Sequence, residues 1–124
     1  MSVATEETRA FAKRFAERNR GTVPSQYQAG IYSAVRHYLK AIEAAGTDEA
    51  MAVAAKMRAL PVNDVFTKGG VVRADGRHVH DLYLVEVKKP EESKGAWDYY
   101  KVVATIPGEQ AYTKKAETKC ALWK

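Results

Sequence analysis

Apolar residues in the first half of the chain recur at the spacing of an α-helix. Phe11 and Phe15 lie one turn apart, and a later series consists of Ala50, Val53, Ala54 and Met57. The longest series lies between these two and consists of Ile31, Val35, Tyr38, Leu39 and Ile42. Because one helical turn takes three to four residues, these series predict three helices within residues 5–60.

Polar residues in front of each series indicate where the helices begin. Thr5 is predicted as the first N-cap because two glutamates follow it in the electropositive first turn. Ser25 and Gln28 have the spacing of a capping box at the start of the second helix. Thr47 is predicted to cap the third helix.

Glycine and proline indicate where the same helices end. Gly21 and Pro24 close the first segment, because neither residue continues a helix well. Gly46 supplies a C-cap for the second helix, and Pro61 marks the end of the third. The three helices are therefore separated by well-defined breaks.

The second half, residues 62–124, has the composition of strands and turns. Val71–Arg73 and Val79–Lys88 predict a hairpin, with Asp75–Gly76 between them in a type I′ turn. Tyr99–Ile106 predicts another strand, and a short helix is expected around Glu109–Tyr112. The predicted fold class is α+β, with three helices followed by a small, mainly antiparallel sheet and a short C-terminal helix.

The central strand is apolar on both of its faces. Leu82–Val85 contains no polar position in the alternating pattern except the tyrosine hydroxyl, so this strand is expected to need cover on both sides. Three helices are expected to cover one face only. Some apolar surface or sheet edge should therefore remain for a second chain or a missing partner domain.

Length and composition fit one compact domain. The chain has 124 residues, 46% of them hydrophobic, so residues 1–124 are predicted to form a single domain. The formal net charge is +5, but the basic pairs Lys88–Lys89 and Lys114–Lys115 are each followed closely by acidic residues. Interleaved charges are typical of a solvated face, and no nucleic-acid partner is predicted.

The chain shows no targeting or membrane signal. No stretch approaches the roughly 20 apolar residues that a membrane span needs, and acidic residues near the N-terminus argue against a signal peptide. The single cysteine, Cys120, excludes an internal disulfide. By these signals, the chain expressed as it stands is expected in the cytoplasm.

Histidine, cysteine and aromatic residues are the side chains of this sequence that could form a metal, catalytic or stacking site. His37, His78 and His80 lack a further ligand at metal-binding spacing, so they are predicted to be surface or satisfied polar residues. Nothing in the sequence orients a base toward Cys120. Trp97, Tyr99 and Tyr100 are predicted to form core rather than a stacking platform. No enzyme activity, metal or cofactor is predicted.

Several ordered segments resemble one protein family. They are FAKRF (11–15), PSQYQAGIYSAVRHYLKAI (24–42), RADGR (73–77), HDLYLVEVKKP (80–90), ESK (92–94) and WDYYKV (97–102), with Cys120 near the end. Together they resemble the C-terminal portion of type I periplasmic solute-binding proteins, the extracellular receptors of ABC importers for branched-chain amino acids and aromatic acids.

The resemblance implies a receptor rather than an enzyme. Such receptors have two α/β lobes that close on a small amino acid or aromatic carboxylate in the periplasm and deliver it to an ABC permease. The resemblance places Tyr27, with Gln28 beside it, against the ligand, although both residues also suit packing or capping at a helix start. The chain is predicted to be a truncated receptor that does not bind ligand alone. The alternative prediction is a self-associating interaction module, most simply a homodimer.

Overall fold

The computed structural model describes residues 5–123 and begins with α1, Glu6–Arg18. Thr5 caps this helix as predicted, and its side chain accepts a hydrogen bond from the backbone N–H of Thr8. Phe11 is buried and its ring lies 4.8 Å from that of Tyr32, measured between centroids, which joins α1 to the next helix. The first predicted helix is therefore confirmed, although it ends before Gly21.

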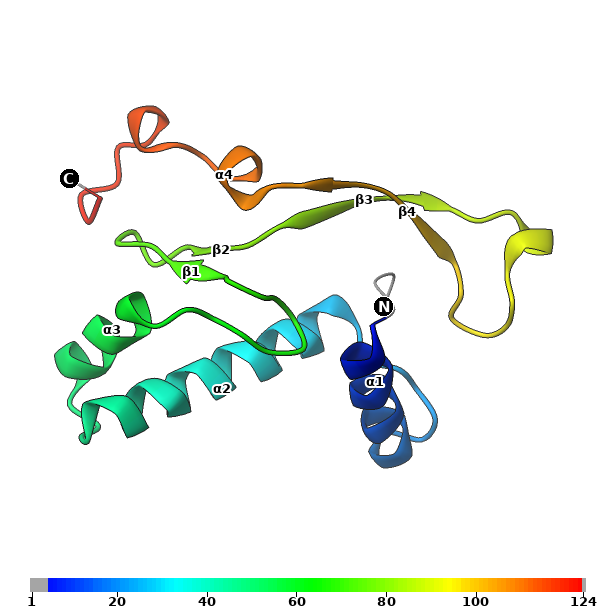
Figure 1. Ribbon diagram of the computed structural model, residues 1–124, viewed down its shortest axis with the longest axis horizontal. Coiled ribbons are helices and arrows are strands. Elements are labelled where there is room, and N and C mark those ends of the chain that lie inside the picture. Colours follow the sequence, from blue (N-terminus) through cyan, green and yellow to red (C-terminus); the bar gives the residue numbers. More distant parts are fainter. Residues whose placement is uncertain (1–4, 124) are drawn as a thin grey trace.

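The second helix, α2, is the longest element and runs from Gln26 to Ala45 (Figure 1). Its predicted capping box is present: Ser25 N–H donates to Gln28 Oε1 at 2.8 Å, and Gln28 N–H donates back to Ser25 Oγ. Gly46 ends the helix at a φ of 67°, a left-handed conformation that glycine adopts without strain. Both ends of α2 were thus predicted correctly.

The third helix, α3, spans Ala50–Ala59, and the prediction of its cap was wrong. Glu49 is the N-cap, because its two carboxylate oxygens accept hydrogen bonds from the N–H groups of Met51 and Ala52. These bonds lower the pKa of Glu49 below its usual value. Thr47 instead accepts from the N–H of Glu49, so it supports the cap from outside the helix.

The predicted strand over Tyr99–Ile106 is confirmed, but the predicted hairpin of residues 71–73 with 79–88 is not formed over that length. The sheet region contains two separate two-stranded antiparallel sheets, one of β1 (Val71–Val72) with β2 (His78–Val79), the other of β3 (Leu82–Val87) with β4 (Tyr100–Ile106). The predicted strand over 79–88 is broken at Asp81, whose carboxylate accepts the N–H of Gly108 at 3.0 Å. The break lets β3 pair with β4 while β2 stays with β1.

The β1–β2 turn is also not of the predicted type. Gly76 has a φ of 79°, whereas Asp75 is absent from the residues with positive φ in the described chain. A type I′ turn needs positive φ at both central positions, so this prediction is wrong. Gly76 N–H donates to Arg73 O and Arg73 N–H to Arg77 O, which places a single left-handed glycine after a tight turn.

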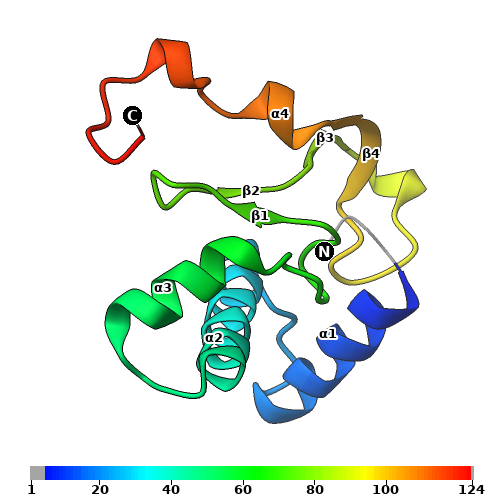
Figure 2. The same cartoon turned by 60° about the vertical axis from the view of Figure 1, so that its left-hand side comes forward.

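The layers place the helices on one side and the sheets on the other. α2 and α3 pack together with β1–β2 over them, and β3–β4 projects away from α3 toward a tip formed by the 3₁₀ turn η1, Pro90–Glu92 (Figures 1 and 2). After β4 come the short helix α4, Gly108–Ala111, and the 3₁₀ turn η2, Lys115–Glu117. No helix in residues 5–123 is long and apolar enough to cross a membrane.

Candidate functional site

Tyr27 lies in the first turn of α2 with 75% of its surface exposed. Gln28, its neighbour, uses its side-chain oxygen in the capping box at 2.8 Å from Ser25 N. The structure therefore confirms the capping role of Gln28 and leaves Tyr27 free of packing at the helix start. Neither observation tests ligand contact by these two residues.

An apolar stripe along α2 is exposed. The stripe begins at Tyr27 and continues at helical spacing. Its members are all exposed, and they are Tyr27, Ile31, Val35, Tyr38 and Leu39. We call this surface the helix stripe. Exposed apolar side chains gathered on one helix face are typical of a surface that another segment covers.

The opposite stripe of α2 is buried although it is small and partly polar. Ala29, Ser33, His37 and Ala41 are all buried. Ser33 Oγ donates to Asp64 Oδ2 at 2.7 Å, and His37 Nε2 lies 2.9 Å from Met57 O in α3. These contacts hold α2 to α3 and to the following loop, so the predicted satisfied role of His37 is confirmed. These contacts also determine which face of α2 remains exposed to solvent.

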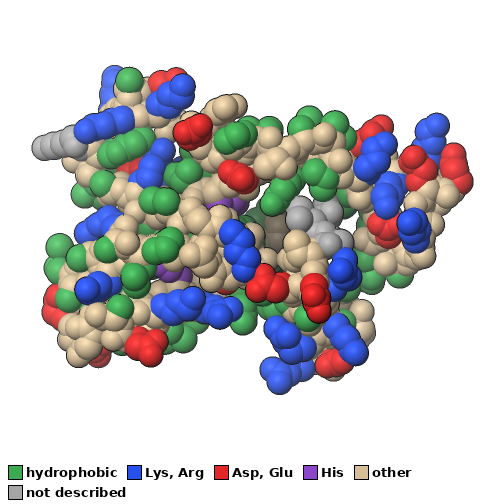
Figure 3. Space-filling model, in the orientation of Figure 1, with side chains coloured by type: hydrophobic (Ala, Val, Ile, Leu, Met, Phe, Trp, Pro, Cys, Tyr) green, Lys and Arg blue, Asp and Glu red, His purple; other side chains and the backbone are tan. Residues whose placement is uncertain are grey.

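The β3–β4 hairpin is the second open apolar surface. Every residue of both strands is exposed, including Leu84, Val87 and Val103. Figure 3 shows hydrophobic side chains over these strands, with charged side chains gathered at the tip of the hairpin. We call β3 and β4 the hairpin surface. The expected helical cover of one face is absent from it in the described chain.

The aromatic residues at the start of β4 and just before it do not form core, contrary to the prediction. Trp97, Tyr99 and Tyr100 are all exposed, and they contact one another edge to face, with centroids 6.1 Å apart for Trp97–Tyr99 and 6.5 Å for Tyr99–Tyr100. Trp97 has a φ of 70°, so it stands outside the strand. Their place beside an uncovered hairpin is the physical reason that they remain exposed.

Two histidines meet where the sheets and the C-terminal segment join. The rings of His78 and His80 lie 5.0 Å apart between centroids, and Phe66 packs against both. His80 Nε2 lies 3.1 Å from the hydroxyl oxygen of Tyr112, whereas His78 Nε2 is buried with no hydrogen-bond partner. Within residues 5–123, no three histidine, cysteine or acidic side chains gather closely enough to hold a metal ion.

The family model for periplasmic binding proteins matches residues 2–96, which is most of the chain. The chain belongs to the periplasmic binding protein family. Two solved structures share its fold closely. A periplasmic binding protein from Burkholderia mallei is 51% identical with a TM-score of 0.93, and the match covers 97% of this chain and 32% of that one.

The second structure is a branched-chain amino acid ABC transporter periplasmic ligand-binding protein from Burkholderia xenovorans LB400. It is 46% identical with a TM-score of 0.92, and the match covers 99% of this chain and 33% of that one. A comparison with curated proteins gave no match. The chain thus spans about a third of the length of these binding proteins, and the predicted family and fold class are confirmed.

Sequence reasoning missed the residue that ties this segment of a binding protein together. Asp64 is buried and accepts hydrogen bonds from Ser33 Oγ, from Phe66 N at 2.8 Å and from Thr67 N at 3.3 Å. The Asn63–Asp64 pair could have indicated an Asx turn over 64–67, because such side chains bond to backbone N–H groups just ahead. Nothing local indicates its contact with Ser33.

Acidification is expected to destabilise this binding-protein segment through His78. Burial is the main cause that lowers the pKa of His78 below 6.5; His80 and His37 add to this and Asp64 opposes it. The unfolded chain therefore takes up the proton at higher pH than the folded chain. The contribution of His78 to the free energy of unfolding should be constant above pH about 6.5 and fall as the pH drops below it, down to the folded pKa of His78.

Urea unfolding at several pH values measures this dependence. In His78→Gln the part of the pH dependence that arises from this residue should disappear, because glutamine does not titrate. An unchanged pH dependence in the variant would assign the effect to other groups and contradict the prediction.

Proposed function

We propose that this chain is part of the substrate-binding component of an ABC importer for branched-chain amino acids or related small carboxylates. The observation that carries the proposal is the 46% identity, over 99% of this chain, to a protein described as a branched-chain amino acid ABC transporter ligand-binding protein. Identity at this level over a shared fold favours a shared role. The role is binding and delivery in the periplasm to a membrane permease, without catalysis.

The geometry supports Tyr27 as a ligand contact of the assembled receptor. Its ring is exposed at the N-terminus of α2, next to the positive dipole end of that helix. A carboxylate is favoured at such an end, and an exposed ring beside it suits the apolar part of an amino acid. Gln28 shapes the same turn through its capping bond.

The chain alone is expected to supply only one wall of the ligand site. Tight small-molecule sites enclose about 70 to 90% of the ligand surface, and an exposed helix end encloses far less. Titration calorimetry of the 124-residue chain with leucine, valine or benzoate should therefore give no binding heat. Micromolar binding by the chain alone would contradict the prediction.

A chimeric protein tests whether the chain takes part in ligand binding when the rest of a receptor is present. The matching third of the Burkholderia xenovorans protein is replaced by this chain, and the ligands of the unmodified protein are titrated. The chimera should bind them, and Tyr27→Ala should weaken binding about tenfold or more by removing a buried aromatic contact. Met51→Ala, which removes a similarly exposed apolar side chain from α3, outside the helix stripe, is the matched control and should bind as the chimera does.

A second candidate function is self-association. The helix stripe and the hairpin surface favour it, because both are apolar and exposed. Another copy of the chain could cover the same surfaces that the remainder of a receptor would cover.

A further inference from the structure

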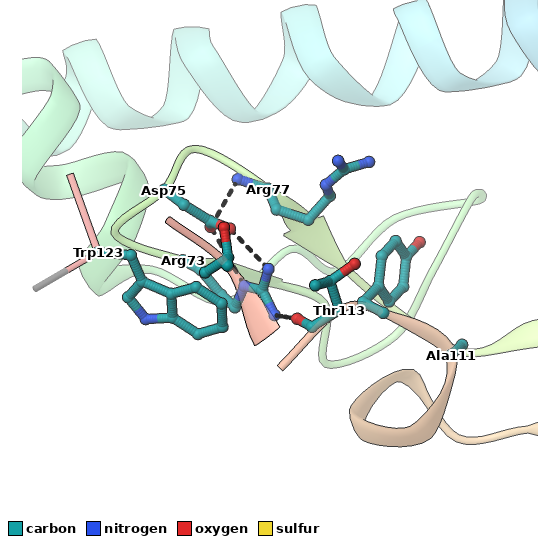
Figure 4. Close-up of a pocket in the computed structure, with 8 residues that line it drawn as sticks. Arg73, Asp75, Arg77, Ala111, Thr113 and Trp123 are labelled. Atoms are coloured by element: carbon teal, nitrogen blue, oxygen red, sulfur yellow. Dashed lines mark hydrogen bonds and ion pairs between the residues drawn. The ribbon is translucent and has the colours of Figure 1, made fainter. Parts of the chain in front are cut away.

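A polar pocket lies where the β1–β2 turn meets the C-terminal segment. Its volume is about 380 Å³, within the range of small-ligand sites, and it contains neither Tyr27 nor Gln28. Figure 4 shows Arg73 of the turn between Trp123 and Thr113, which belong to the segment after α4. The residues on which its chemistry depends are Arg73, Asp75, Arg77, Thr113, Thr118 and Trp123.

Arg73 is the fixed part of the pocket. Its guanidinium donates to both carboxylate oxygens of Asp75, at 3.1 and 2.6 Å, and to the backbone O of Thr113 at 2.9 Å. The guanidinium carbon also lies 3.9 Å from the centroid of the Trp123 ring. Its charge is therefore compensated by Asp75, whose pKa is lowered mainly by this hydrogen bonding. Arg73 joins the hairpin to the C-terminal segment.

Arg77 is the charged group of the pocket that has no ion-pair partner among residues 5–123. Its backbone N–H donates to Asp75 at 3.1 Å, but its guanidinium makes no hydrogen bond or ion pair with any residue of 5–123. The guanidinium carbon lies 5.9 Å from the centroid of the Tyr112 ring, a cation–π contact that orients the group and leaves its donors free. With Arg73 and Asp75 compensating each other, Arg77 gives the pocket a net positive charge.

Two threonines add polar groups beside this charge. Thr113 and Thr118 both line the pocket, and each hydroxyl can donate one hydrogen bond. Thr118 Oγ1 already accepts from Cys120 N–H at 3.2 Å, which leaves its own hydrogen to be donated elsewhere. A guanidinium with free donors and two hydroxyl groups that line the same pocket supply the hydrogen-bond donors that an oxyanion accepts.

We propose that this pocket binds a compact oxyanion, held by the Arg77 guanidinium and the hydroxyls of Thr113 and Thr118. Carboxylate and phosphate groups share the chemistry that the pocket recognises. Arg73 and Asp75 hold the site in place. Because their charges compensate each other, they add no net charge to the pocket. Because Arg77 belongs to the β1–β2 turn and Thr113 and Thr118 to the C-terminal segment, an anion bound by all three stabilises the docking of that segment on the turn.

NMR titration of the 124-residue chain tests the site. Inorganic phosphate and formate are added separately at constant ionic strength, and the backbone amides of residues 77, 113 and 118 are followed. Saturable shifts at these amides, with a Kd of about 1 mM or tighter for either anion, are expected. Tighter phosphate binding assigns a phosphate-bearing ligand and tighter formate binding a carboxylate. No saturation by either anion up to about 20 mM overturns the proposal.

Two matched variants separate a specific site from general charge attraction. Arg77→Gln should weaken binding about tenfold or more, because it removes the uncompensated charge and the guanidinium donors. Its spectrum should otherwise match the parent, since the Arg77 guanidinium makes no hydrogen bond with residues 5–123. Arg36→Gln removes one exposed charge from α2 and should leave binding unchanged. Equal binding by Arg77→Gln and the parent, or an equal loss in Arg36→Gln, overturns the proposal.

Discussion

Asp64→Ala is expected to lower the free energy of unfolding by about 3 kcal/mol, because it leaves buried donors without an acceptor. Asp64 is 6% exposed and Ser33 2%, and their side chains are 2.7 Å apart. The substitution also removes the acceptor of the Phe66 and Thr67 N–H groups. These bonds connect the middle of α2 to the loop that precedes β1, so their loss should loosen the packing of the sheets on the helices.

Urea denaturation followed by circular dichroism measures this change. Asp64→Asn retains one side-chain oxygen as acceptor and should cost less than the alanine variant. Asp48→Ala removes an exposed carboxylate from the loop before α3 and should change stability by no more than about 0.5 kcal/mol. If Asp64→Ala and Asp48→Ala unfold at the same urea concentration, the Asp64 contacts do not stabilise the fold.

The 124-residue chain is expected to self-associate in solution through the helix stripe and the hairpin surface. Burying apolar surface contributes about 25 cal/mol per Å², so a few hundred Å² already amounts to several kcal/mol. In a sheet of only two strands, β3 and β4 are also both edges whose outer backbone groups can pair with another copy. Light scattering after gel filtration should give about twice the chain mass of 13.8 kDa.

Charge substitutions show which surface forms this contact. Leu84→Lys in the hairpin surface and Ile31→Lys in the helix stripe each place a cation where a partner would exclude water, so one or both should shift the mass to that of a monomer. Met51→Lys replaces a more exposed apolar residue in α3, outside both surfaces, and should leave the mass unchanged. A parent chain that stays monomeric at all concentrations would contradict the prediction. The helix stripe and the hairpin surface would then be stable while exposed to solvent.

The sequence by itself determined the elements whose signals are local. The capping bonds of Thr5 and Ser25 join residues three positions apart, and Gly46 ends α2 through its own backbone conformation. The ordered motifs also predicted the family correctly. Such features depend on neighbours within one turn, so the residue types near a position are enough to predict them.

Only the tertiary structure decided which apolar surfaces are covered. The pattern of α2 identifies Ile31, Val35 and Leu39 as its apolar face, yet the fold buries the opposite face through the contact of Ser33 with Asp64. That contact spans 31 positions, and the contacts of Tyr112 with His80 and of Arg73 with Thr113 span 32 and 40. The pairing of β3 with β4 and the anion pocket depend on such distant partners. A periodic pattern states how apolar a face is, but what packs against that face is set by chain segments far away in the sequence.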